Sequence, residues 1–144
     1  MAFTYFVDNS LAPVAGGNAY ATKAKCDLML NFHPRWQMAT STEREQLIMD
    51  ATAQLDSLDY VGTLVSGTQP LQFPRVMSTE ITGEFTLVNQ VRRLFRALVQ
   101  QIEYNLSRQG MGVTQYSHVN ESFTPRQDTI CREALFSLTP YLRN

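Results

Sequence analysis

Apolar residues that recur every three or four positions divide the chain into four expected helices. The clearest pattern predicts a substantially buried helix over about residues 87–108, roughly 30 Å long. We expect Gly110 and Gly112 to end it. Its apolar stripe consists of Val88, Val91, Leu94, Phe95, Leu98, Val99, Ile102 and Leu106.

Three shorter patterns predict the remaining helices. Asn18 is a suitable N-cap for a first helix over about 19–31, which Pro34 would close. Thr42 and Glu45 fit a capping box, so we expect a second helix from there to about residue 58. A short last helix is predicted over about 127–138. The inward-facing residues would be Ala21, Ala24, Leu28 and Phe32 in the first helix, Leu47, Ile48, Ala51, Leu55 and Leu58 in the second, and Ile130, Ala134, Leu135 and Leu138 in the last.

The segments between these patterns are rich in Gly, Pro, Ser and Thr. Residues 1–17 and 33–41 are expected to be irregular, and residues 60–86 to form a long loop with short extended pieces at 61–65 and 80–87. Residues 113–119 alternate like a strand, and Asn120–Thr124 would form the turn or the return strand if this strand is half of a hairpin. The predicted fold is therefore mainly α: a small bundle of about four helices with a long irregular loop and a short β-hairpin or strand.

Composition is consistent with one domain that buries its own core. The chain has 144 residues, of which 44% are apolar, and a net charge of −1 argues against a basic surface over the whole molecule. Cys26 and Cys131 lack zinc-ligand spacing, and we interpret both as buried thiols in a reducing compartment. With no apolar run long enough for a membrane span and no signal-peptide pattern, we expect a protein that is made in the cytoplasm and does not contact a membrane.

No enzyme motif accompanies this organisation. The chain lacks phosphate-loop, dinucleotide, zinc-protease and nucleophile-elbow patterns, and its two histidines, His33 and His118, are far apart. We therefore expect no catalytic residues, no cofactor and no metal. The carboxylates between residues 43 and 59 do not repeat on one helical face, so we interpret them as a solvated acidic surface.

Charge is unevenly distributed between two of the helices. Arg92, Arg93, Arg96 and Arg108 give the segment 87–108 a local charge of +3, whereas residues 43–59 carry −4. Complementary outer faces, a subunit interface and contact with a DNA backbone are all compatible with this pattern, and we favour the first two. Arg92 and Arg96 share a face while Arg93 is expected to point elsewhere, and Phe95 is assigned to the core stripe.

Several motifs, in order, resemble the head–tail connector (adaptor) proteins of tailed bacteriophages. The likeness spans about residues 17–142. It comprises Gly17-Asn18-Ala19-Tyr20, Trp36 followed by Thr42–Glu45, Leu47-Ile48-x-x-Ala51-Thr52-x-x-Leu55-Asp56, Tyr60-Val61-Gly62, Gln69-Pro70-Leu71-Gln72-Phe73-Pro74-Arg75, Ala134-Leu135 and Pro140-Tyr141-Leu142.

The resemblance implies a structural virion protein of the neck or tail region. Residues 1–144 would form one adaptor domain, with 139–144 as a C-terminal extension, and about twelve copies would form a ring. This ring would join the portal protein to a tail or head-closure protein, and double-stranded DNA would pass through its lumen. The alternative is an accessory module that binds single-stranded nucleic acid, as some related chains are labelled.

Ten residues are candidates for protein interfaces under the connector reading. They are Gln69, Leu71, Phe73, Arg75, Arg92, Arg96, Pro140, Tyr141, Leu142 and Arg143. Two alternatives remain open. Phe73 either anchors an interface or folds back on its own domain, and the tail 139–144 either docks on the portal or packs on this chain's own first or third helix.

Overall fold

A computed structural model describes residues 2–77, 83–111 and 130–143. The fold is mainly α, as predicted, with five helices and one two-stranded antiparallel hairpin in the described part of the chain. The helices are α1 (Lys23–Leu30), α2 (Pro34–Met38), α3 (Ser41–Asp56), α4 (Leu87–Met111) and α6 (Arg132–Leu138), and the strands are β1 (Thr63–Leu64) and β2 (Arg75–Val76). Two short 3-10 helices, η1 (Gly83–Phe85) and η3 (Thr139–Tyr141), precede α4 and follow α6.

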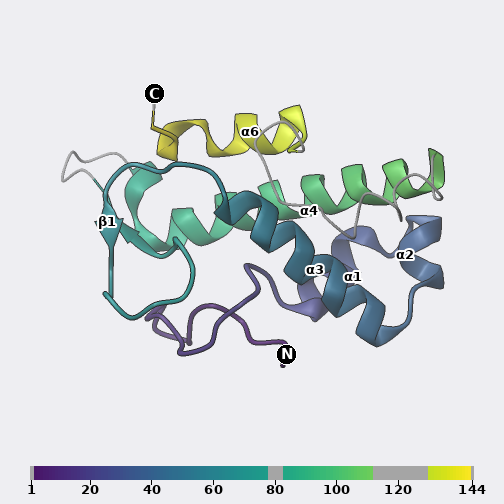
Figure 1. The fold of residues 1–144 in the computed structure, drawn as a ribbon, viewed down its shortest axis with the longest axis horizontal. Helices are drawn as coiled ribbons and strands as arrows, with labels where there is room; N and C mark the ends of the chain where they lie inside the picture. Colours follow the sequence, from purple (N-terminus) through teal and green to yellow (C-terminus); the bar gives the residue numbers. More distant parts are fainter. Residues whose placement is uncertain (1, 78–82, 112–129, 144) are drawn as a thin grey trace.

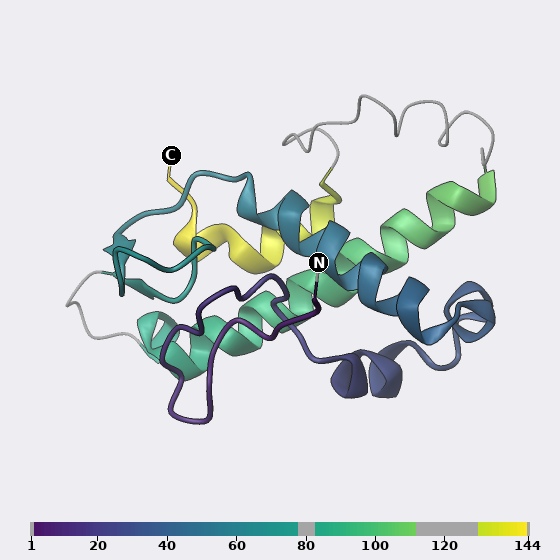
Figure 2. The ribbon, with the colours of Figure 1, turned by 60° about the horizontal axis from the view of Figure 1, so that its bottom comes forward.

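Helix α4 forms the axis on which α1, α3 and α6 pack (Figure 1). Its buried stripe contains Leu94, Leu98, Ile102 and Leu106, as the apolar spacing predicts. The N-terminal segment 2–22 winds as an irregular layer below α3, and a second view shows α6 and α1 on different sides of α4 (Figure 2). The core is thus built around one long amphipathic helix. Of the other predicted members, Val91 and Phe95 are half-buried and pack against the core, whereas Val88 is 51% exposed.

The first helix departs most from expectation. It begins at Lys23, capped by the Thr22 side chain, because Asn18 is used elsewhere: its Oδ1 accepts from the Thr4 backbone at 2.9 Å. Its buried residues are Cys26 and Leu30, whereas Leu28 is 77% exposed and Phe32 is 70% exposed. The predicted inward face was therefore wrong, since the apolar spacing fits two faces of this helix and tertiary packing selects the other one.

Boundaries shift in the other helices for local reasons. Helix α3 begins two residues early, because Thr40 and Glu43 make both hydrogen bonds of a capping box, at 3.2 and 2.8 Å. Pro34 starts α2 instead of only closing α1, which suits proline in a first turn. Gly110 lies inside α4, which continues to Met111.

The long loop is more ordered than its composition indicates. Strands β1 and β2 pair antiparallel with Thr63 opposite Val76, which confirms an extended piece at 61–65. In the described part of the expected extended piece 80–87, residues 83–85 form η1 and Leu87 begins α4, so no strand is found there. Helix α6 starts at Arg132 with Cys131 as its N-cap, later than predicted. The predicted strand 113–119 and the start of the last predicted helix lie outside the described residues.

Candidate functional site

A buried arginine holds the loop that was predicted to carry an interface. Arg75 is 7% exposed, and its guanidinium donates to Val61 O and Gly62 O at 2.7 Å each and to Gln72 Oε1 at 2.9 Å. Gln90 on α4 binds the backbone of Arg75 on both sides, accepting from its N at 3.0 Å and donating to its O at 2.8 Å. Arg75 therefore ties the hairpin to α4 and is not presented at the surface.

Phe73 also folds back on its own domain, which is the second of the two alternatives, and does not project as an interface anchor. Its ring is 1% exposed and lies 4.7 Å from the ring of Tyr60 and 6.0 Å from that of Tyr20, between centroids. The Tyr20 hydroxyl donates to Asp56 and accepts from the Phe73 backbone. Burial raises the pKa of Asp56, and the hydrogen bonds from Tyr20 and Gln72 lower it in part. Asp56 is thus part of the fold and not of a solvated acidic surface.

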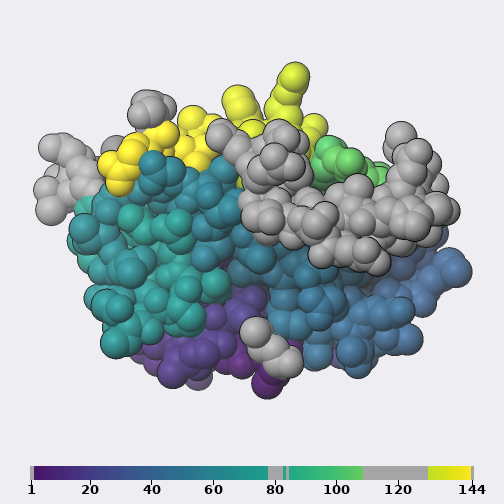
Figure 3. Space-filling view, viewed as in Figure 1, coloured from purple at the N-terminus to yellow at the C-terminus, as the bar shows by residue number. Residues whose placement is uncertain are grey.

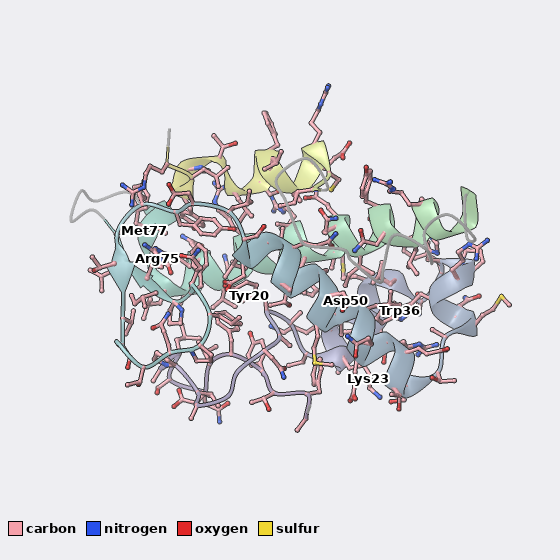
Figure 4. All side chains as sticks on the ribbon, viewed as in Figure 1. Tyr20, Lys23, Trp36, Asp50, Arg75 and Met77 are labelled. Atoms are coloured by element: carbon pink, nitrogen blue, oxygen red, sulfur yellow. The ribbon has the colours of Figure 1, made fainter. Side chains whose placement is uncertain are left out.

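The remaining loop candidates have roles within the same turn. Gln69 donates through Nε2 to Leu71 O and Pro74 O, both at 2.9 Å, and its Oε1 accepts from the Ser66 backbone. Leu71 is half-buried against the core. Arg75 and Tyr20 lie toward the hairpin end of the molecule, while Trp36 lies toward the opposite end, near α2 (Figure 4). The Gln-to-Arg motif is explained by this hydrogen-bonded turn.

The C-terminal tail packs on this chain. Tyr141 is fully buried, its carbonyl accepts from the Val61 backbone at 2.9 Å, and Leu142 bridges Tyr60. The Arg143 backbone donates to Asp59 O, and its side chain pairs with the Asp59 carboxylate at 3.3 Å. Pro140 lies within η3. The yellow tail and the teal loop are neighbours on the surface in Figure 3. The tail thus packs on this chain, as one of the two alternatives had it, and its partners are residues 59–61.

The outward face of α4 gathers three arginines around a hollow. Asn89, Arg92, Arg93 and Arg96 line a depression of about 230 Å³, which we call the arginine hollow. Arg92 and Arg96 are exposed, and no ion pair among the described residues engages either of them. Arg93 was expected to point elsewhere, but it lines the same hollow because residues three apart are neighbours on a helix. Its Nη1 donates to Ser137 O of α6 at 3.1 Å.

Other chemistry is sparse in the described part of the chain. It contains no group of three or more His, Cys, Asp or Glu that could hold a metal ion, and no helix there is long and apolar enough to cross a membrane. His33 caps α2, where its Nδ1 accepts from the Arg35 backbone at 3.3 Å, and His118 lies outside the described residues. Cys26 and Cys131 are free, buried thiols, as predicted, and burial raises the pKa of Cys26 to about 12.

A family model covering residues 3–122 decides between the two readings of the sequence. Its description is "Putative DnaT-like ssDNA binding protein". The chain belongs to this DnaT-like family. The connector assignment was therefore wrong, and with it the role of a virion adaptor that binds a portal. The match does not bear on copy number or localisation, which stay predictions. No curated protein and no solved structure matches the chain.

The matched residues contain the arginine hollow and leave out α6 and the C-terminal tail. Two of the motifs behind the connector resemblance, Ala134-Leu135 and Pro140-Tyr141-Leu142, thus fall outside the DnaT-like region. A third, Gln69 to Arg75, lies inside it and is accounted for by the turn described above. The sequence did signal Arg92 and Arg96, but it did not predict that Arg93 lines the same hollow.

Proposed function

We propose that this DnaT-like chain binds single-stranded DNA through the arginine hollow on α4. The observation that carries the proposal is the cluster of Arg92, Arg93 and Arg96 in one depression, without a carboxylate paired to Arg92 or Arg96 among the described residues. A guanidinium presents a planar fork of donors that matches the oxygens of a phosphate, so such a cluster suits a nucleic-acid backbone. The family description supports the choice of single-stranded DNA.

The position of the hollow strengthens its attraction for phosphate. Asn89 lies in the first turn of α4, where the helix dipole contributes positive potential, and Arg92 lies in the next turn. The sequence of α4 contains one acidic residue, Glu103, which lies almost two turns beyond Arg96. The net charge of −1 is therefore compatible with a basic surface that is confined to one helix face.

The test measures how binding of a fluorescent oligo-dT strand depends on salt. For single strands, the logarithm of the binding constant falls with the logarithm of salt concentration by about 0.7 per neutralised phosphate. We expect the double variant Arg92→Gln/Arg96→Gln to bind more weakly and to reduce this slope by about 1.4. Arg93 is left in place because its bond to Ser137 supports the packing of α6.

A charge-matched control distinguishes binding at the arginine hollow from a general effect of removing two positive charges. Arg35→Gln/Arg132→Gln removes two exposed arginines from α2 and α6 and should leave the slope nearly unchanged. An equal loss in both double variants would exclude the hollow as the site. Failure of the unmodified protein to bind oligo-dT at low salt would refute the function, and tighter binding to a duplex of equal length would refute the preference for single strands.

A further inference from the structure

An aromatic ring stands on α4 next to two arginines of the hollow and contacts α1. Phe95 lies one turn after Arg92 on α4 and directly precedes Arg96. Its side chain is half-buried, and Lys25 Nζ lies 5.9 Å from the centroid of its ring. Lys25 belongs to α1, so this cation–aromatic contact joins the two helices beside the hollow.

The helix that carries Lys25 also exposes large apolar side chains. Lys25, Leu28 and Phe32, which we call the α1 face, are spaced by three and four residues. Asn31 keeps helical dihedral angles after the last turn of α1, so the spacing holds as far as Phe32. Leu28 is 77% exposed and Phe32 is 70% exposed. Two large apolar side chains thus face solvent in line with a lysine.

The acidic residue of this helix does not disturb the surface. Asp27 is held by two neighbours: its Oδ1 accepts from Trp36 Nε1 at 3.0 Å and lies 3.3 Å from Arg44 Nη1. Arg44 in turn stacks 5.4 Å from the centroid of the Trp36 ring. The negative charge of Asp27 is therefore compensated within the fold, and the α1 face combines positive charge with apolar and aromatic surface.

We infer that the α1 face and Phe95 contact the bases of the strand whose phosphates lie on Arg92 and Arg96, an inference that rests on the proposed function. Single-strand binding combines a positive track for the backbone with aromatic or apolar surface for the bases. Every base has a π-face, so such contacts tolerate any sequence. Arg92 and Arg96 supply the positive track, and Phe95, with Lys25, Leu28 and Phe32 on the neighbouring helix α1, supplies the aromatic and apolar surface.

The opposite wall of the hollow is less suited to bases. Phe136 on α6 is 80% exposed, and it precedes Ser137, whose carbonyl accepts from Arg93. The exposed charges of α6 are Arg132 and Glu133, so this helix adds no net positive charge, whereas the α1 face carries Lys25. Helix α6 also lies outside the residues matched by the DnaT-like family model. We therefore assign the bases to α1, and Phe136 provides a matched control.

The experiment compares oligo-dT with an abasic strand of equal length, which carries the same phosphates without bases. We expect the unmodified protein to bind oligo-dT more tightly, by about fivefold or more for each stacked base. Phe32→Ala and Phe95→Leu should reduce this preference while leaving affinity for the abasic strand unchanged. Phe136→Ala should keep the preference. Far-UV circular dichroism checks folding, and Phe32 is exposed enough for its replacement to leave the core intact.

The outcomes separate this inference from the function it rests on. If the unmodified protein binds neither strand, the proposed function fails, and the inference fails with it. If it binds both strands equally, the function stands and the base contact is refuted. If Phe136→Ala removes the preference while Phe32→Ala and Phe95→Leu keep it, the bases lie against α6 and the assignment to α1 is overturned.

Discussion

Replacing Arg75 tests whether its motif serves the fold or a partner. In Arg75→Leu the side chain keeps apolar bulk and loses all of its donors. The carbonyls of Val61 and Gly62 then lose bonds of 2.7 Å, and Gln72 Oε1 loses one of 2.9 Å. Because the guanidinium lies in a nearly closed site, water cannot readily replace it at these carbonyls.

The magnitude follows from these bonds. A hydrogen bond to a charged group contributes about 1.5–3 kcal/mol, and a buried acceptor left without a partner costs about 1–3 kcal/mol. Removing the charge also removes the free-energy cost of burying it. The same burial lowers the pKa of Arg75 from its usual value. We therefore expect a net loss of about 3–4 kcal/mol of unfolding free energy, a large share of the 5–15 kcal/mol typical of small domains. Arg75→Lys should lose about 2 kcal/mol, because one ammonium cannot span the same acceptors.

Urea unfolding followed by far-UV circular dichroism measures this loss. Arg92→Leu is the matched control, since the same change at an exposed position should alter stability by no more than about 0.5 kcal/mol. The two variants should behave oppositely in DNA binding: Arg75→Leu, once folded, retains affinity, and Arg92→Leu loses it. A loss below 1 kcal/mol for Arg75→Leu, or loss of DNA binding with unchanged stability, would refute the structural role.

Three further outcomes are expected. Phe73→Ala should lower the unfolding free energy by about 3–5 kcal/mol in urea titrations, as truncation of a fully buried ring does. Deleting residues 139–144 should destabilise the isolated protein, measured as a lower melting temperature, because Tyr141 leaves the core. Burial raises the pKa of the Cys26 thiol from 9.0 to about 12, so its contribution to stability is complete below pH 9 and is lost as pH rises toward 12. Cys26→Ala should therefore show a shallower fall in unfolding free energy between pH 9 and 11 than the unmodified protein.

The sequence predicted α4 well because one physical signal dominates there. Leu94, Leu98 and Ile102 repeat over several turns, and a helix of that length has one way to bury them. Helix α1 is short, and its apolar residues fall on two faces, so the sequence did not reveal that Leu28 and Phe32 face outward. Which face of α1 is buried depends on the side that meets α4, and this is a property of the tertiary arrangement.

The candidate site was predictable only in part for a related reason. The spacing of Arg92 and Arg96 was visible, but the contact of Arg93 with α6 was not, because Ser137 lies 44 residues away in the sequence. The motif at residues 69–75 was misleading, because in a sequence the residue types that a buried turn requires look the same as those of a protein interface. Gln69, Phe73 and Arg75 each satisfy a buried or turn position, so their order is explained without any partner.

Formal charge is a poor guide to what this protein offers a ligand, because folding engages much of it. Among the acidic residues of 43–59, Glu43 caps α3, Asp56 accepts hydrogen bonds from Tyr20 and Gln72, and Asp59 pairs with Arg143. Arg92 and Arg96 have no such partner in the described residues. Arg92 and Arg96 thus present available positive charge on one face of α4, although the chain as a whole is slightly acidic. A polyanion would respond to that local field, since interactions with more distant charges are screened beyond about 8–10 Å at physiological salt.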